Sequence, residues 1–267
     1  MIYVIANLSF FIENVAERDI WKRFAKLTYN AKKVDCSVDT NSKCMEIHGI
    51  QYERLPFLVE HLSRIGADIM LCSRSWDRAK IASTSGDVER MDMFLLQLFY
   101  IHAAQKQMIQ IHSSLVNCEE QGLMFLGPSG IGKTTQAELW NKYRDALIIN
   151  GDIVFVQETP DAFLGWGTPW HGSSPYCENT SVPLKAMIVL KQSPENSIRE
   201  LTGFEKVTAV SNNVFYPRWL ENGMELCLET LDHLLSRIPV YELSCRPDEE
   251  AVKLTEETIF GSGSVSD

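Results

Sequence analysis

Residues 127–134 read Gly-Pro-Ser-Gly-Ile-Gly-Lys-Thr and match the pattern G-x-x-x-x-G-K-[ST] in full. In such a loop the glycines let backbone N–H groups converge on phosphate oxygens, and the helix that follows adds its positive end. The lysine reaches the β- and γ-phosphates, and the threonine hydroxyl binds Mg²⁺. The pattern predicts a site for ATP and Mg²⁺, formed by Gly127, Ser129, Gly130, Gly132, Lys133, Thr134 and Thr135. Nucleotide binding does not by itself establish catalysis.

Asp152 is the candidate for the acidic partner of this loop. A Mg²⁺–nucleotide site normally uses a carboxylate at the end of a neighbouring strand. Asp152 lies between two apolar runs in LIINGDIVFV, directly after the helix that the loop opens. A lone aspartate between strands is often only a turn residue. We expect Asp152 to bind the metal and to act in catalysis.

Two histidines are further candidates. His112 alternates with apolar neighbours in MIQIHSSLV, just before the loop, and a core histidine is the alternative reading. It would act as a base or as a cationic partner of the transferred phosphate. His171 lies in GWGTPWHGSS (165–174), a Gly- and Trp-rich segment that either covers a ligand or forms a structural turn.

Three cations are weaker candidates for contact with the transferred phosphoryl group, because an arginine or lysine often neutralises charge there. They are Lys185, Arg199 and Arg218. Surface solvation is the usual fate of such side chains.

These residues require a strand–loop–helix–strand arrangement around the loop. The pattern predicts strands in MIQIHSSLV, GLMFL and ALIINGDIVFV, with CEEQG as a turn and KTTQAELWNKYRDA as the helix. Further strands are expected in AFLGWGTPWHG, VPLKAMIVLKQ and PVYELSCRP. Residues 204–238 are mostly helical in pattern, interrupted at Pro217, and DEEAVKLTEETI predicts a closing helix with Asp248 as its N-cap.

The region before the loop has a different pattern. Strand-like pieces occur in MIYVIANLSFFI, CMEIHGI and ADIMLCS, and LPFLVEHLSRIG is helix-like. A buried helix is expected over 87–107, because apolar residues recur at helical spacing from Met91 to Ile101. We divide the chain into residues 1–105 of unknown role, a catalytic core over 106–258 and a disordered tail over 259–267.

Composition restricts the class of protein. The chain has 267 residues and a net charge of −10, which argues against broad binding of nucleic acid or anionic membranes. It lacks a secretory signal pattern and any apolar run of about 18 residues, the length that a spanning helix needs. Seven scattered cysteines without a C-x-x-C pair indicate reduced thiols. We expect a cytoplasmic protein.

With these residues in place, the chain over about 105–255 resembles the HPr kinase/phosphorylase family and its relatives, which share a core with phosphoenolpyruvate carboxykinases. IHSSLV, GLMFLGPSGIGKTT and LIINGDIVFV follow in the order of the family's histidine strand, nucleotide loop and acidic strand. The resemblance implies an α/β fold with a mixed-sheet phosphate-loop core and a small α/β amino-terminal region. It also makes a homo-oligomer plausible.

Carried over by position, the resemblance implies that Lys133 and Thr134 hold phosphate and metal, that His112 is the active-site histidine and that Asp152 is the second of two acids. Gly151 stands where the family has its first acid, the general base. Either Asp152 does both jobs, or His112 or His171 supplies the base, or proton removal matters little.

The reaction we expect is transfer of the γ-phosphoryl group of ATP to a hydroxyl, on a serine of a peptide or small protein. Lys133, Asp152 and His112 are the expected catalytic residues, with Thr134 and Asp152 at the metal. Two alternatives stay open: a kinase acting on a small molecule, and a nucleotide-binding regulator without transfer activity. Gly151 keeps the second alternative credible.

Overall fold

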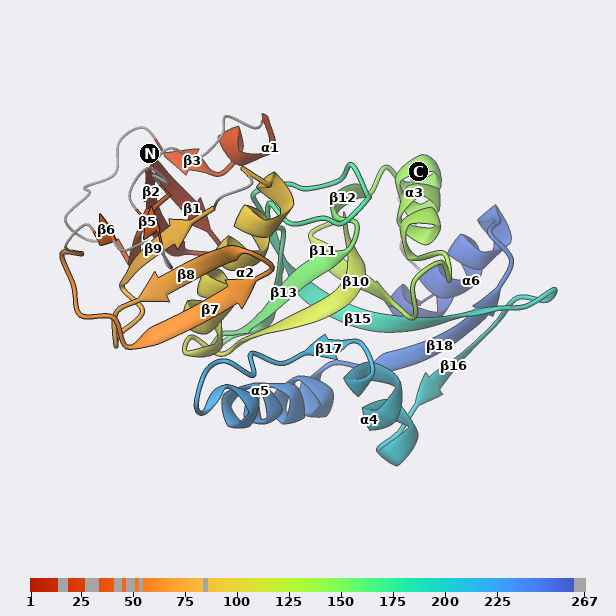
Figure 1. Cartoon of the computed structure of the whole chain (residues 1–267). Coiled ribbons are helices and arrows are strands. Elements are labelled where there is room, and N and C mark those ends of the chain that lie inside the picture. Colours follow the sequence, from red (N-terminus) through yellow and green to blue (C-terminus); the bar gives the residue numbers. More distant parts are fainter. Residues whose placement is uncertain are drawn as a thin grey trace. The chain divides into compact units, whose positions relative to one another are not determined.

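The structure is a computed structural model that describes residues 1–13, 19–26, 34–40, 45–46, 51–52, 55–83 and 86–261. The chain divides into two compact units, Met1–Ala103 and Ala104–Asp267, and each contains a mixed β-sheet with helices (Figure 1). The expected mixed α/β class is therefore confirmed. Most of the expected strand in 44–50 and residues 262–267 of the expected tail lie outside the described residues.

The first unit is built on a seven-stranded sheet of order β3-β1-β2-β4-β9-β8-β7, in which β2–β4 and β4–β9 are parallel pairs. A separate pair is formed by β5 and β6. The elements are β1 Ile2–Ile5, β2 Leu8–Glu13, α1 Asp19–Lys22, β3 Ala25–Lys26, β4 Cys36–Asp39, β5 Met45–Glu46, β6 Gln51–Tyr52, β7 His61–Ile65, β8 Asp68–Cys72, β9 Arg78–Ala82 and α2 Val88–Ala104.

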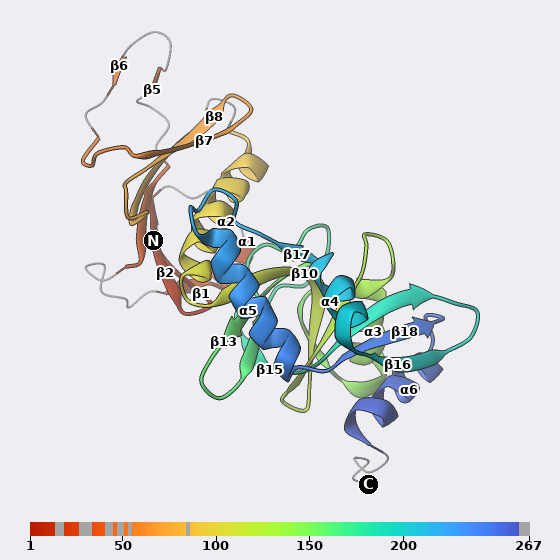
Figure 2. The same cartoon turned by 90° about the horizontal axis from the view of Figure 1, so that it is seen from below.

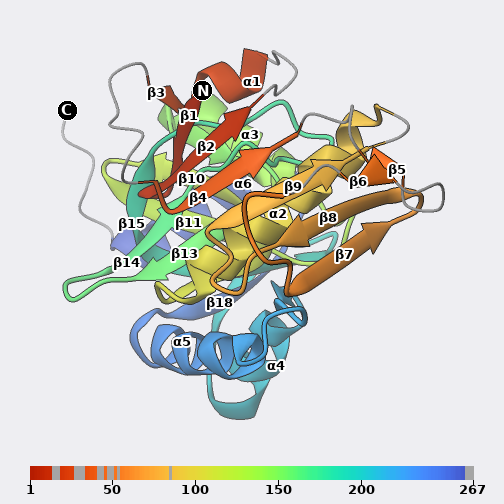
Figure 3. The ribbon, with the colours of Figure 1, turned by 60° about the vertical axis from the view of Figure 1, so that its left-hand side comes forward.

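The expected helix over 87–107 is confirmed as α2, which packs on this sheet (Figure 3). Phe94, Leu98 and Ile101 are fully buried, and the Phe99 ring lies 6.0 Å from the Phe10 ring of β2. Apolar residues at helical spacing therefore face the core, as the pattern predicts.

The expected helix in 55–66 is wrong, because residues 61–65 form strand β7. Burial alternates along these five residues, and they pair with β8 in the register His61↔Cys72 to Ile65↔Asp68. A two-residue turn joins the strands, with Gly66 at φ 61°, a conformation that favours glycine. Tertiary pairing overrides the weak local helical pattern.

The second unit is built on a nine-stranded sheet in which two long strands change partners along their length (Figure 1). The first half of β10 pairs with β13 and the second half with β11 and β12. β15 pairs first with β14, then with β11 and β18. The strands are β10 Met108–Cys118, β11 Gln121–Leu126, β12 Leu147–Asn150, β13 Ile153–Glu158, β14 Phe163–Trp166, β15 Ser181–Gln192, β16 Ser197–Leu201, β17 Val214–Phe215 and β18 Val240–Cys245.

Four helices flank this sheet: α3 Lys133–Arg144, α4 Gly203–Ser211, α5 Gly223–Arg237 and α6 Glu249–Phe260. Trp140 of α3 and Val252 of α6 share one buried core with Phe125, Ile188 and Leu243 of the sheet. Figures 1 and 2 show α4 and α5 on the other side of the sheet.

The expected elements of this unit are present, with the strand expected in ALIINGDIVFV divided into β12 and β13 at Gly151-Asp152. Asp248 caps α6 as expected, because its carboxylate accepts the N–H of Ala251. The helix includes residues 259 and 260, which the sequence assigns to the tail. Among the described residues, no helix combines the length and apolar character needed to cross a bilayer.

Candidate active site

The 127–132 loop joins the end of β11 to the first residue of α3. Gly127, Gly130 and Gly132 have φ angles of 140°, 80° and 116°, which residues with a Cβ rarely adopt. A Cβ at Gly130 or Gly132 would meet no neighbouring atom, so glycine is needed there for conformation rather than for space. The local sequence therefore forms a tight loop whose backbone leads into a helix amino terminus.

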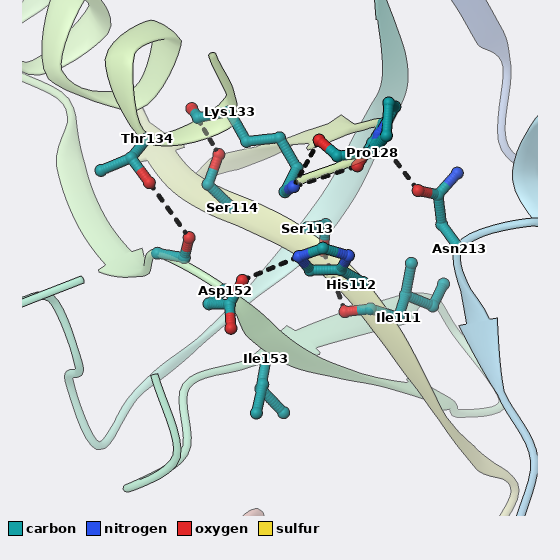
Figure 4. A network of polar contacts seen from close by, with 12 residues as sticks. Ile111, His112, Ser113, Ser114, Pro128, Lys133, Thr134, Asp152, Ile153 and Asn213 are labelled. Atoms are coloured by element: carbon teal, nitrogen blue, oxygen red, sulfur yellow. Dashed lines mark hydrogen bonds and ion pairs between the residues drawn. The ribbon is translucent and has the colours of Figure 1, made fainter. Parts of the chain in front are cut away.

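The Lys133 side chain curls back over this loop (Figure 4). Its Nζ donates to the carbonyl oxygens of Gly127 at 3.0 Å and Pro128 at 3.2 Å, and the residue is buried. Burial lowers the pKa of this ammonium, and the negative charge of Asp152 opposes that shift. A cation held here in a poorly solvated place would gain from an anionic ligand.

His112 and Asp152 form a direct pair across the β10–β13 junction (Figure 4). His112 Nε2 lies 2.8 Å from Asp152 Oδ1, and both side chains are partly exposed. The strands fix this pairing because the N–H of Ser113 donates to the carbonyl of Asp152 at 3.0 Å. His112 is thus partly exposed and paired, and Asp152 lies in the turn between β12 and β13.

The pair has an electrostatic consequence. The hydrogen bond from His112 is the largest cause that lowers the pKa of Asp152, helped by the charges of His112, Lys133 and His171, while burial opposes it. Asp152 is therefore held ionised beside the amino terminus of α3. Thr134 lies at the same place, with its hydroxyl 3.4 Å from the carbonyl oxygen of Gly151.

Asn150 organises the backbone around Asp152, and the sequence analysis did not single it out. Its buried Oδ1 accepts the N–H groups of Asp152 and Ile153, both at 2.9 Å. Its Nδ2 donates to the carbonyls of Thr168 and Trp170 at 3.2 and 3.0 Å. One amide thus ties the Asp152 turn to the 165–174 segment. The sequence does contain a signal for this role, because a buried asparagine at the end of an apolar strand must find hydrogen-bond partners.

The 165–174 segment packs directly on the acidic turn. Gly172 has φ 58°, and a Cβ built on it would lie 2.2 Å from Asp152 Oδ2. The ring of His171 contacts the carbonyl of Ser174 through Nδ1. This segment therefore packs against the Asp152 carboxylate, and the close approach requires glycine at position 172.

The same segment leaves no space for a side chain at residue 151. A Cβ on Gly151 would lie 1.9 Å from Ser174 Oγ and 2.5 Å from Ser174 Cβ. The N–H of Gly151 also donates to the carbonyl of Tyr176 at 3.3 Å. Ser174 therefore occupies the space that a first acid would need.

Asn213 is a second buried amide that the sequence analysis did not single out, and only the tertiary contacts reveal it. Its Oδ1 accepts the N–H of Gly127 at 3.1 Å, and its backbone carbonyl accepts the N–H of His112 at 2.8 Å (Figure 4). Its Nδ2 donates to Ala209 at 2.9 Å. It links the end of α4 to both the loop and the histidine strand.

The weaker candidate cations lie elsewhere. Lys185 is near the start of β15 and places its Nζ 5.9 Å from the Phe260 ring. Arg199 pairs with Glu205 and Glu242, and Arg218 is exposed after β17. The structure does not bring Lys185 or Arg199 together with Lys133 and Asp152.

A groove of about 520 Å³ continues from the 127–132 loop. One wall contains Ile131, Thr135 and Gln136, and the other comes from residues 190–194 and 245–247 at the ends of β15 and β18. Gln136 is buried, donates to Cys245 Sγ at 3.2 Å and leaves its Oε1 without a partner. The groove therefore lies directly beside the glycine loop and the first turns of α3.

The donor set fits Mg²⁺ bound together with phosphates. Within the described part of the chain, no group of three or more His, Cys, Asp or Glu residues forms a metal cage. The Thr134 hydroxyl and the Asp152 carboxylate are hard oxygen donors, and Mg²⁺ is usually held by one or two protein oxygens plus substrate phosphates and water.

Comparisons with known proteins give one family. The model of the family described as SynChlorMet cassette protein ScmC matches residues 80–247. A solved structure of the HPr(Ser) kinase/phosphatase from Coxiella burnetii is 11% identical, with a TM-score of 0.32, and covers 56% of this chain and 95% of that chain. At this TM-score the likeness carries no argument about fold or activity. A search of the curated proteins found no match.

Proposed function

The chain belongs to the ScmC family of SynChlorMet cassette proteins, and we propose that it is an ATP-dependent phosphotransferase. It would move the γ-phosphoryl group of ATP to a hydroxyl, on a serine of a peptide or small protein. The observation that carries this proposal is the His112–Asp152 pair, 2.8 Å apart, beside the glycine loop and Lys133, the first residue of α3.

The nucleotide would lie along the 127–132 loop. The N–H groups of the loop and of the first turn of α3 would bind the phosphates, and Lys133 would leave its two carbonyl partners to bind the β- and γ-phosphates. The nucleoside would extend into the groove beside Thr135 and Gln136.

Thr134 and Asp152 are the residues that would hold Mg²⁺. The ion, when bound, neutralises charge on the β- and γ-phosphates. The hydroxyl of Thr134 has only a long contact with the Gly151 carbonyl, so it is readily released for this role. Asp152 is partly exposed and its pKa is lowered, so its ionised carboxylate suits the same role.

His112 would act as the general base. A neutral ring that donates from Nε2 to Asp152 keeps its Nδ1 lone pair available, and the carboxylate stabilises the imidazolium that forms. The acceptor O–H would give its proton to Nδ1 as its oxygen bonds to the γ-phosphorus. The bond from that phosphorus to the β,γ-bridging oxygen breaks, and ADP leaves. This assignment replaces the absent acid at Gly151.

The substitution Lys133→Ala tests the proposal. We expect wild-type protein to transfer ³²P from γ-labelled ATP to serine peptides in the presence of Mg²⁺. The variant should lose transfer by roughly 10³-fold or more, because it removes the charge that stabilises the transferring group.

Lys185→Ala is the matched control, because that lysine lies away from the loop and should leave transfer unchanged. Retained transfer in Lys133→Ala protein would contradict the proposal. Binding of a fluorescent ATP analogue with no transfer to any peptide or small molecule would favour the nucleotide-binding regulator, which the packing of Ser174 on Gly151 also favours.

A further inference from the structure

Helices α4 and α5 lie on one side of the second unit (Figure 2), and the stretch that contains them is rich in exposed apolar side chains. Six of the thirteen large apolar side chains that are exposed among the described residues fall within residues 204–228. They are Phe204, Val207, Phe215, Trp219, Met224 and Leu228. Contiguous apolar patches on a folded protein mark interaction surfaces, so the grooves that some of these residues line are of interest.

A groove of about 510 Å³ runs between the two helices. Val207 of α4 and Leu228, Leu231 and Leu235 of α5 line its apolar part, and Leu228 also borders a second, more open hollow with Met224. We call the residues that line this groove, together with Met224 and the acidic stripe described next, the α4–α5 surface.

An acidic stripe runs beside the apolar one. Glu225, Glu229 and Asp232 are exposed, and their spacing of four and three residues places them along one face of α5. Glu221, which is also exposed, precedes the helix by two residues. Met224, Leu228 and Leu235 occupy the adjacent face at helical spacing. Within the described residues, none of these four carboxylates makes an ion pair, whereas Glu158 pairs with His233 and Arg237.

The other charges on this surface do not cancel the stripe. Glu200 and Lys206 in the groove offset one another, and Arg199 is taken up by Glu205 and Glu242. Arg218 is exposed on the 212–222 connection, and His233 of α5, which lies near Glu229 and Asp232, pairs with Glu158. The surface therefore combines an apolar groove with an excess of negative charge.

This surface connects to the candidate active site through β17. Val214 and Phe215 pair with Ile111 and Gln110 of β10, and the Phe215 ring lies 6.3 Å from the His112 ring. Asn213, the residue before β17, binds both the 127–132 loop and the backbone of His112. A chain lying over α5 and β17 would thus lead to His112.

We propose that the α4–α5 surface binds a positively charged, amphipathic segment of the acceptor peptide and directs a neighbouring serine to His112. Its lysine or arginine side chains would pair with the acidic stripe, and its apolar side chains would fill the groove. This inference rests on the proposed function for the peptide nature of the acceptor. The charge of the surface selects a basic peptide over an acidic one.

A peptide-binding experiment tests the inference. The probe is a fluorescein-labelled serine peptide of about 15 residues, the length of α5, with lysines and leucines on adjacent helical faces. A matched peptide carries glutamate in place of each lysine. Fluorescence anisotropy with the full chain should detect the lysine peptide and not the glutamate peptide, with binding that weakens as salt rises.

The variant Glu225→Lys/Glu229→Lys should weaken binding of the lysine peptide by roughly 10- to 100-fold. The control Glu89→Lys/Glu257→Lys makes the same change in net charge at exposed sites on α2 and α6 and should bind as wild type. Circular dichroism and binding of a fluorescent ATP analogue show that each variant is folded.

Equal binding of both peptides, unchanged binding by the α5 variant, or equal weakening by the control variant would overturn the inference. The binding assay contains no ATP, and Lys133→Ala protein should bind the lysine peptide normally. Failure of phosphoryl transfer and failure of peptide docking are therefore separate results.

Discussion

At the scale of residues, Asp152 joins three parts of the candidate site. Its Oδ1 bonds to His112, its N–H bonds to Asn150, and its Oδ2 lies against the backbone of Gly172. A carboxylate fixed in this way changes its orientation little on ligand binding, which is what a catalytic or metal-binding group requires.

His112→Ala should shift the pH dependence of Mg²⁺-dependent nucleotide binding. The pKa of Asp152 is lowered chiefly by the His112 hydrogen bond and raised by burial. The ionised form is therefore present above the depressed pKa and is lost as pH falls through it. Without His112 that pKa rises, so the acid limb of binding moves to higher pH. Titration with a fluorescent ATP analogue measures the shift.

His233→Ala is the control for this titration, because it removes a histidine that also pairs with a carboxylate, Glu158, but on α5. Its acid limb should coincide with that of wild type. An unmoved midpoint in His112→Ala protein would show that Asp152 does not depend on this partner.

Gly151→Asp, which restores the acid of the resembled family, should destabilise the protein by about 1–3 kcal/mol because the new side chain overlaps Ser174. Urea denaturation measures the loss. The double variant Gly151→Asp/Ser174→Gly should recover most of it, since it removes the overlapping atoms. If Gly151→Asp alone is as stable as wild type, the close packing of the 172–176 turn is not what excludes an acid.

At the scale of elements, the asparagine that ends β12 decides how three segments meet. Asn150→Ala removes four hydrogen bonds at a fully buried position and leaves the carbonyls of Thr168 and Trp170 without that donor. We expect a loss of about 2–4 kcal/mol in the free energy of unfolding. Urea denaturation of the purified variant checks this value.

Asp248→Ala provides the comparison for Asn150→Ala. It removes the N-cap bond at α6 together with the hydrogen bonds that the carboxylate accepts from Asn196 and Arg246, and it should cost about 1–2 kcal/mol. If the two variants lose equal free energy of unfolding, the four hydrogen bonds of Asn150 stabilise the fold no more than the contacts of a helix N-cap.

The elements differ in how far the sequence predicts them. The sequence predicts α2 from the helical spacing of its apolar residues, and it predicts α6 from the N-cap residue Asp248. Strand β7 is misread as helix because its five residues acquire their structure from pairing with β8. Strand β16 is missed, since most of SIREL is exposed and, among the described residues, it pairs with β18 alone.

At the scale of the whole molecule, the second unit depends on strands that exchange partners. The first half of β10 meets β13 and β17, and the second half meets β11 and β12. His112 lies at this change of partners, which is why it can face Asp152 while the same strand leads into the hairpin before the 127–132 loop. Such pairings join residues distant in sequence, and local periodicity contains no information on them.

The sequence by itself determined the glycine loop, the helix after it and the order in which histidine, loop and acid occur, because each rests on local residue types and spacing. Only the tertiary structure decided that His112 and Asp152 touch, that Asn150 and Asn213 support them, and that Ser174 fills the space beside Gly151. The physical reason is that these contacts arise from strand pairing and side-chain packing between distant segments, which no single stretch of sequence encodes.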